Sequence, residues 1–186
     1  MNPPVTTLAN PNPAEWNGAS PGEFLVMLTR AGATGVALRG LLDSLRVELP
    51  ERTLELIALR TSAQLDCSYS WSGHVHIALD RVLTMQEIAC VAANGNLLGG
   101  TDALTLGAVD ELLRDGLLSN ETRSALGEEA DRVTIAMTSY QLVARLTARM
   151  TPEPRAERVL SLASPLRARI TYAALVHAGT IDATDA

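Results

Sequence analysis

The chain has 186 residues, of which 47% are hydrophobic and 19% are charged. This length and composition are typical of one soluble globular domain and exclude an intrinsically disordered protein. The net charge is −6, and all 15 basic residues are arginines spread along the chain, so the basic patch of a nucleic-acid-binding protein is excluded as well.

Helix start and stop signals recur along the chain, and no segment has the alternating pattern of a β-strand. We therefore predict an all-α fold. The expected helices, in chain order, cover residues 24–30, 36–45, 50–64, 67–81, 84–94, 102–114 and 119–150, followed by two more that end before residue 179.

Capping residues place several of these helix boundaries. Asp66, Asp102 and Ser119 can each accept hydrogen bonds from the first backbone N–H groups of the helix that follows. Thr84 and Glu87 have the spacing of a capping box. These signals predict helix starts after residues 66, 84, 102 and 119.

The expected domain organisation is simple. Residues 1–21 carry five prolines among asparagine, threonine and glycine, which predicts an extended or mobile segment. Residues 22–178 form one helical domain, and residues 179–186 form a tail. The first residues lack the basic and apolar regions of a secretory signal, and no apolar run approaches the ~18 residues of a membrane span. We expect a cytoplasmic protein that binds no membrane.

The scarce side chains of this sequence cluster in one place. Cys67, Tyr69, Trp71, His74 and His76 fall within ten residues, although the chain has only two cysteines, three histidines and six aromatic residues. Steps of three and four residues return to one face of a helix. That periodicity divides the cluster, because it separates Tyr69 and His76 from the other three.

Four residues, Cys67, Ser70, Trp71 and His74, share the face that is of chemical interest. A thiol in the first turn of a helix is favoured as thiolate by the helix dipole, and an imidazole further along can exchange its proton. His74 could act as an acid or base, with Cys67 as nucleophile, proton carrier or pocket wall. The alternative for each residue is an ordinary core position.

Other site chemistries do not fit the cluster. His74 and His76 point about 200° apart on a helix, so they cannot chelate one metal ion together. No Gly-x-Ser-x-Gly elbow of a serine hydrolase occurs. Cys90 lies in an apolar stretch and is interpreted as a core residue. We therefore expect no metal site at this cluster.

The runs LPERTLELI (49–57), CSYSWSGH (67–74) and LTMQEI (83–88) resemble the carboxymuconolactone decarboxylase and alkylhydroperoxidase D-like (AhpD-like) superfamily. The resemblance extends over roughly residues 22–165, and its specific part lies between residues 50 and 90. It implies an all-α helical bundle, catalysis without a cofactor, and assembly as a homo-oligomer, either a trimer or a hexamer.

The peroxidase branch of this superfamily uses the pattern Glu-x11-Cys-x2-Cys-x3-His. Glu55, Cys67 and His74 match it, but Ser70 stands at the second cysteine. A dithiol cycle requires two sulfur atoms, so Ser70 argues against this mechanism unless Cys90 supplies the second thiol.

The decarboxylase-like branch has the pattern Cys-x-Tyr-Glu-Trp-x-x-His. Cys67, Tyr69, Trp71 and His74 match it, and Ser70 replaces the glutamate. The resemblance therefore favours the decarboxylase-like branch, without its carboxylate at position 70.

The sequence thus predicts an acid/base enzyme without a cofactor, which acts on a small carbonyl- or lactone-containing acid by decarboxylation, isomerisation or a related ring-forming or dehydrating step. The expected catalytic residues are His74, which moves the proton, Glu55, which relays or orients it, and Cys67. Ser70 and Trp71 are expected to bind the substrate.

Two alternatives stay open, a thiol peroxidase that uses Cys67 and a non-catalytic oligomeric binding module. Arg60, on the helix of Glu55, either binds a substrate carboxylate or forms an ion pair.

Overall fold

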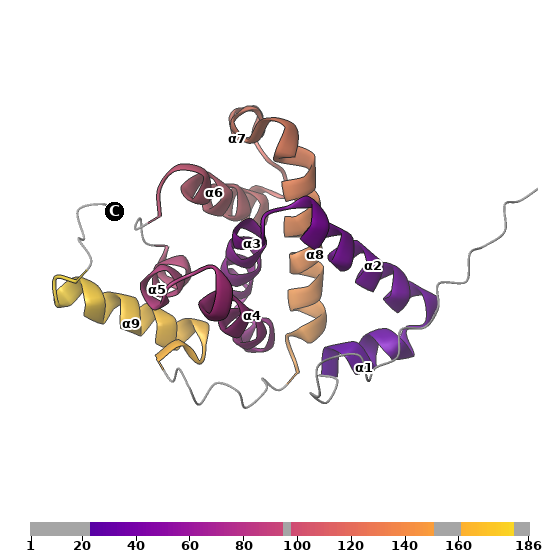
Figure 1. Ribbon diagram of the computed structural model, residues 1–186, viewed down its shortest axis with the longest axis horizontal. Helices are drawn as coiled ribbons and strands as arrows, with labels where there is room; N and C mark the ends of the chain where they lie inside the picture. Colours follow the sequence, from indigo (N-terminus) through magenta and orange to yellow (C-terminus); the bar gives the residue numbers. More distant parts are fainter. Residues whose placement is uncertain (1–22, 95–97, 151–160, 181–186) are drawn as a thin grey trace, which may run out of the picture. The chain divides into compact units, whose positions relative to one another are not determined.

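A computed structural model describes residues 23–94, 98–150 and 161–180 (Figure 1). Helices dominate these residues and no strand occurs among them, which confirms the all-α prediction. The segment predicted to be extended or mobile, residues 1–21, lies outside the described residues, and so does most of the predicted tail, from residue 181 onward.

The described helices fall into two compact units that divide between Ser44 and Leu45. The first unit contains α1 (Glu23–Arg30) and the greater part of α2 (Ala33–Glu48). These are the two short N-terminal helices that the sequence predicts, with α2 longer at both ends.

Glycines shape the turn of this first unit. Gly32 has a φ of +59°, a left-handed conformation that glycine adopts without steric cost. Gly35 meets the backbone of α1, since a Cβ atom there would lie 1.9 Å from the carbonyl oxygen of Leu28. Only glycine therefore allows the first turn of α2 to approach α1 this closely.

The second unit is built around α3 (Glu51–Gln64), in which every residue from Leu54 to Ala63 is buried. Helices α4, α5, α6 and α8 all pack against α3, and α9 packs on α5 (Figure 1). A helix buried on all sides lies at the centre of a core. The bounds of the surrounding helices are α4 Ser68–Arg81, α5 Met85–Ala93, α6 Gly100–Asp115, α7 Asn120–Leu126, α8 Ala130–Thr147 and α9 Pro165–His177.

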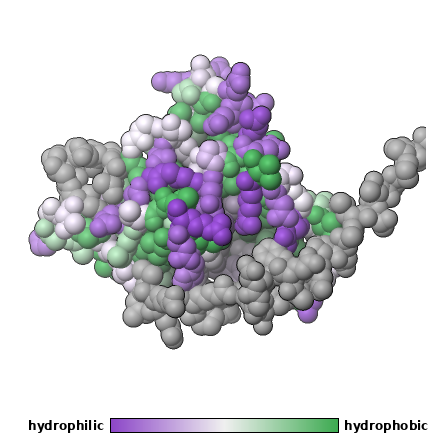
Figure 2. All heavy atoms as spheres, viewed as in Figure 1, coloured by the Kyte–Doolittle hydropathy of each residue, from purple (hydrophilic) through white to green (hydrophobic). Residues whose placement is uncertain are grey.

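Different faces of α3 contribute to two hydrophobic clusters. Leu56 and Leu59 pack with Trp71 and with residues of α5 and α9. Leu54 and Ile57 pack with residues of α6 and α8. Helix α7 buries no residue, and hydrophilic side chains predominate over it in Figure 2. The position of α3 is thus set by packing on opposite sides, which also orients its polar residues.

Several predicted helix boundaries are confirmed. The backbone N–H of Thr84 donates to Glu87 Oε2 over 2.7 Å, and the Glu87 N–H donates to Thr84 Oγ1 over 3.3 Å, which completes the capping box. Asn94 ends α5 in a left-handed conformation with φ 60°. Ser119 accepts a hydrogen bond from the N–H of Thr122 over 3.1 Å at the start of α7.

Three other boundary predictions are wrong. Asp66 has a φ of 51° and does not cap α4, because Cys67 occupies the N-cap position. Asp102 lies inside α6, where its carboxylate accepts a hydrogen bond from Arg52 Nε over 2.9 Å. The long helix predicted for residues 119–150 is interrupted at Gly127, whose φ of 60° and ψ of −132° end α7 before α8 begins.

The glycine contact in the first unit yields a prediction with a control in the same helix. Gly35→Ala should lower the free energy of unfolding by about 1–3 kcal/mol, because the new methyl group overlaps the Leu28 carbonyl. Gly40→Ala places a methyl group where no atom lies within 4 Å, and should raise it by about 0.5–1 kcal/mol. Urea unfolding followed by far-UV circular dichroism measures both. Equal effects of the two substitutions would contradict the packing of Gly35.

Candidate functional site

A hydrogen-bonded pair from α3 and α4 forms the centre of the candidate site. Nδ1 of His74 lies 2.9 Å from Oε2 of Glu55. The Glu55 residue is only 4% exposed. Burying a carboxylate is costly unless a partner compensates for the lost water, and the imidazole is that partner here. The structure therefore brings together two of the three residues predicted to be catalytic.

Tyr140 of α8 completes the surroundings of the imidazole. Its ring lies edge-on to His74, with a centroid distance of 5.2 Å and an interplanar angle of 79°. Burial, followed by the charge of Glu55, raises the pKa of Tyr140 to about 12, against the opposing effect of the neighbouring Arg46 guanidinium. The phenol consequently keeps its proton at neutral pH.

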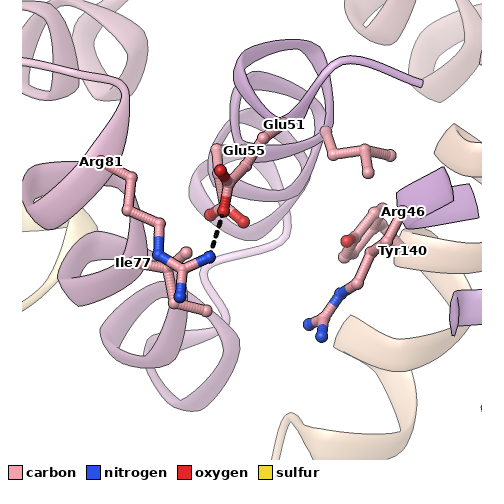
Figure 3. Close-up of a pocket in the computed structure, with 7 residues that line it drawn as sticks. Arg46, Glu51, Glu55, Ile77, Arg81 and Tyr140 are labelled. Carbon is pink, nitrogen blue, oxygen red and sulfur yellow. Dashed lines mark hydrogen bonds and ion pairs between the residues drawn. The ribbon is translucent and has the colours of Figure 1, made fainter.

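A cavity of about 340 Å³ opens beside this group (Figure 3). Its volume is at the small end of the range of ligand pockets. In Figure 3, Arg46 and Tyr140 lie on one side of the cavity, and Ile77 and Arg81 lie on the opposite side. The residues that line it are Arg46, Glu51, Leu54, Glu55, Ile77, Arg81 and Tyr140.

The lining residues divide into a buried part and a rim. Glu55 and Tyr140 are buried, whereas Arg46, Glu51 and Arg81 are exposed. At the rim, Arg81 Nη1 donates to Glu51 Oε1 over 2.7 Å. A ligand that enters would therefore pass charged groups first and reach the Glu55 carboxylate at depth.

Cys67 lies apart from this pair. Its thiol is 3.4 Å from Oγ1 of Thr147, and that hydroxyl donates its own hydrogen to the Val143 carbonyl oxygen over 2.8 Å. Since a hydroxyl has one hydrogen, the sulfur is the donor in the contact with Thr147. The thiol is thus buried and hydrogen-bonded to α8, and its catalytic role stays a prediction.

Ser70 and Trp71 are placed in the interior and do not line the described cavity. The Oγ atoms of Ser70 and Ser62 are 2.9 Å apart, which links α4 to α3. Trp71 is fully buried, and its Nε1 donates to the carbonyl oxygen of Leu162 over 2.8 Å. The four residues that the sequence places on one helix face therefore contact different neighbours, because α3, α8 and the segment that contains Leu162 all pack against that face.

Arg60 forms the ion pair that the sequence allowed. Its guanidinium binds Asp110 of α6 and also donates to the Val91 carbonyl oxygen over 2.6 Å. These contacts hold it away from the cavity. Among the described residues, no group of three or more His, Cys, Asp or Glu side chains is arranged to hold a metal ion.

Sequence reasoning missed most of the cavity wall. Ile77 and Arg81 follow His74 by three and seven residues, a helical spacing that places them on nearly the same face. The sequence therefore contained a signal that could have identified these two residues. Arg46 and Tyr140 come from α2 and α8, far from the motif in sequence, and no local pattern points to them.

A comparison with models of known protein families finds one similarity in this chain. Residues 30–114 match the Carboxymuconolactone decarboxylase family. That part of the chain, which includes Glu55 and His74 but not Tyr140, is similar to this family. No curated protein and no solved structure matches the chain. Within the described residues, no helix is long and apolar enough to cross a membrane.

The burial of both cysteines predicts slow thiol chemistry. Cys67 is 1% exposed and Cys90 is 0% exposed, and a thiol must be reachable and ionised to react. We expect Ellman's reagent to label both thiols slowly in the folded protein and rapidly in guanidinium chloride. Each of the variants Cys90→Ser and Cys67→Ser keeps one thiol, so their labelling rates show which thiol reacts. Rapid labelling of Cys67 in the folded protein would contradict its hydrogen-bonded, buried placement.

The pKa of Tyr140 predicts a loss of stability at high pH. Below pH 10 the phenol is protonated in the folded and in the unfolded chain, so its contribution to the free energy of unfolding is complete. Between about pH 10 and pH 12 the unfolded chain loses this proton while the folded protein keeps it, so the free energy of unfolding falls. The rise of the pKa from 10 to about 12 corresponds to a loss on the order of 3 kcal/mol.

Comparison with Tyr140→Phe isolates this effect, because the other titrating groups are the same in both proteins. The unfolding free energy of the unsubstituted protein should fall relative to that of the variant between pH 10 and pH 12. Parallel pH profiles of denaturant unfolding would show that burial does not affect the ionisation of Tyr140.

Proposed function

We propose that this protein is an acid/base enzyme of the carboxymuconolactone decarboxylase type that acts on a small carbonyl- or lactone-containing acid. The observation that carries the proposal is the Glu55–His74 hydrogen bond at 2.9 Å, with Glu55 lining a cavity of about 340 Å³. A buried carboxylate coupled to an imidazole is a group that can accept and return a proton.

The geometry supports a division of roles within the pair. Glu55 reaches the cavity, so it is the residue that would contact the ligand and take the proton. His74 hydrogen-bonds the Oε2 atom of that carboxylate, and acts as a positioning residue that holds its orientation. The sequence pattern alone suggests the reverse, with His74 moving the proton and Glu55 orienting it.

The walls of the cavity favour a small organic acid. Arg46 places a permanent positive charge at an opening whose volume fits only a small ligand, whereas Arg81 is already ion-paired with Glu51. Leu54 and Ile77 supply apolar surface beside them. Guanidinium groups bind carboxylates well, so an acid would be held at the rim while its carbon skeleton reaches Glu55.

Decarboxylation, isomerisation and dehydration of such acids share one step, the movement of a proton to or from a carbon next to a carbonyl group. A base of suitable pKa in a site shielded from water is sufficient for it. The thiol peroxidase alternative is disfavoured, since the Cys67 thiol is buried against Thr147 and Ser70 supplies no second sulfur.

Solvent exchange tests this proposal through the proton transfer that the candidate reactions share. Carboxymuconolactone, small lactone acids and small oxo acids are incubated with the protein in D₂O, and loss of the ¹H NMR signal next to the carbonyl is followed. We expect catalysed exchange with at least one compound. Glu55→Gln should slow it about 100-fold or more, because the amide cannot accept the proton.

The matched control is Glu121→Gln on α7, an exposed position outside the cavity, which should leave the exchange rate unchanged. Far-UV circular dichroism shows whether each variant is folded. Exchange that persists in Glu55→Gln, or no catalysed exchange with any compound, would refute the proposed function.

A further inference from the structure

Two hydrogen-bond donors lie together on one wall of the cavity, outside the motif that carries the family resemblance. Arg46 comes from the end of α2 and Tyr140 from α8, and the two residues are adjacent in Figure 3. The match to the family ends at residue 114, so it does not include Tyr140. Arg46 and Tyr140 lie across the cavity from Arg81, so the two sides of the cavity carry different groups.

The two arginines at the cavity differ in their existing partners. Arg81 already binds the Glu51 carboxylate over 2.7 Å. Arg46 is exposed at the rim and hydrogen-bonds the Tyr140 side chain, but it forms no ion pair with any residue that the structure describes. A carboxylate that enters the cavity would therefore find its guanidinium partner at Arg46, without first breaking an ion pair.

Tyr140 adds a neutral donor beside this charge. Its phenol is protonated at neutral pH, and the buried Glu55 carboxylate is near enough to influence it. A phenol next to a general base can donate a hydrogen bond to a carbonyl oxygen, and this bond strengthens as negative charge develops on that oxygen. Donor and base thus face the same small space.

We infer that Arg46 and Tyr140 form a recognition pair for an acid that carries a carboxylate and a carbonyl group on adjacent carbons, that is, a 2-oxo acid. The inference rests on the proposed function and names its substrate class. Arg46 binds the carboxylate, Tyr140 donates to the oxo oxygen, and the carbon next to that carbonyl faces Glu55. Because Arg46 and Tyr140 are neighbours, they fit a ligand whose carboxylate and carbonyl oxygens lie on adjacent carbons, as they do in a 2-oxo acid.

Two probes of nearly equal size test the pair by binding alone. 2-Oxopentanoate and pentanoate differ by a carbonyl group in place of a methylene group, and their affinities are measured by calorimetric or NMR titration at pH 7. The unsubstituted protein should prefer 2-oxopentanoate by about 10-fold, the value of one hydrogen bond.

Each member of the pair has its own expected signature. Tyr140→Phe should abolish the preference for 2-oxopentanoate, while pentanoate still binds through Arg46. Arg46→Gln should weaken both probes by about 10-fold or more, since both carry the carboxylate. Tyr172→Phe, on α9 and outside the cavity lining, is the control and should retain the full preference.

These outcomes are independent of turnover. Glu55→Gln should retain the preference for 2-oxopentanoate even if it abolishes proton exchange, so failure of the proposed function and failure of this inference are distinguishable. Absence of a preference in the unsubstituted protein, or a preference that survives in Tyr140→Phe, would overturn the recognition pair. Arg46 is exposed, so Arg46→Gln still tests the carboxylate site if Tyr140→Phe does not fold.

Discussion

The burial of charged groups on α3 is the constraint on which the rest of the second unit depends. This helix lies inside the core along most of its length and still carries Glu55 and Arg60, which are 4% and 3% exposed. Each buried charge must have a partner, because removal from water costs several kcal/mol otherwise. His74 of α4 compensates the first, and Asp110 of α6 with the Val91 carbonyl compensates the second.

The same requirement explains why a site forms at one end of this arrangement and not at the other. The Arg60 guanidinium is enclosed by its partners, so it acts as a structural link among α3, α5 and α6. Glu55 is hydrogen-bonded at Oε2 and also lines a cavity. Its carboxylate is therefore fixed in orientation while remaining available to a ligand, which is the combination that proton transfer requires.

The sequence predicted the contact between Glu55 and His74 better than the cavity around it. Glu55 and His74 were expected to face one another, and they are 2.9 Å apart. Trp71 shares a helix face with His74, but residues on one face can contact different neighbours. The indole is enclosed in the core and hydrogen-bonds the Leu162 carbonyl oxygen. Tyr140 could not be found from local patterns, because its contact with His74 links segments 66 residues apart in the chain.

By itself the sequence determined the all-α class and several helix ends, such as the capping box at Thr84, because periodicity and capping act over a few residues. It also set the spacing that allows α3 and α4 to carry an interacting carboxylate and imidazole. Only the tertiary structure decided which of these polar groups reaches the cavity. Packing against α8 encloses Cys67 and brings Tyr140 to His74, and such long-range contacts depend on the whole core.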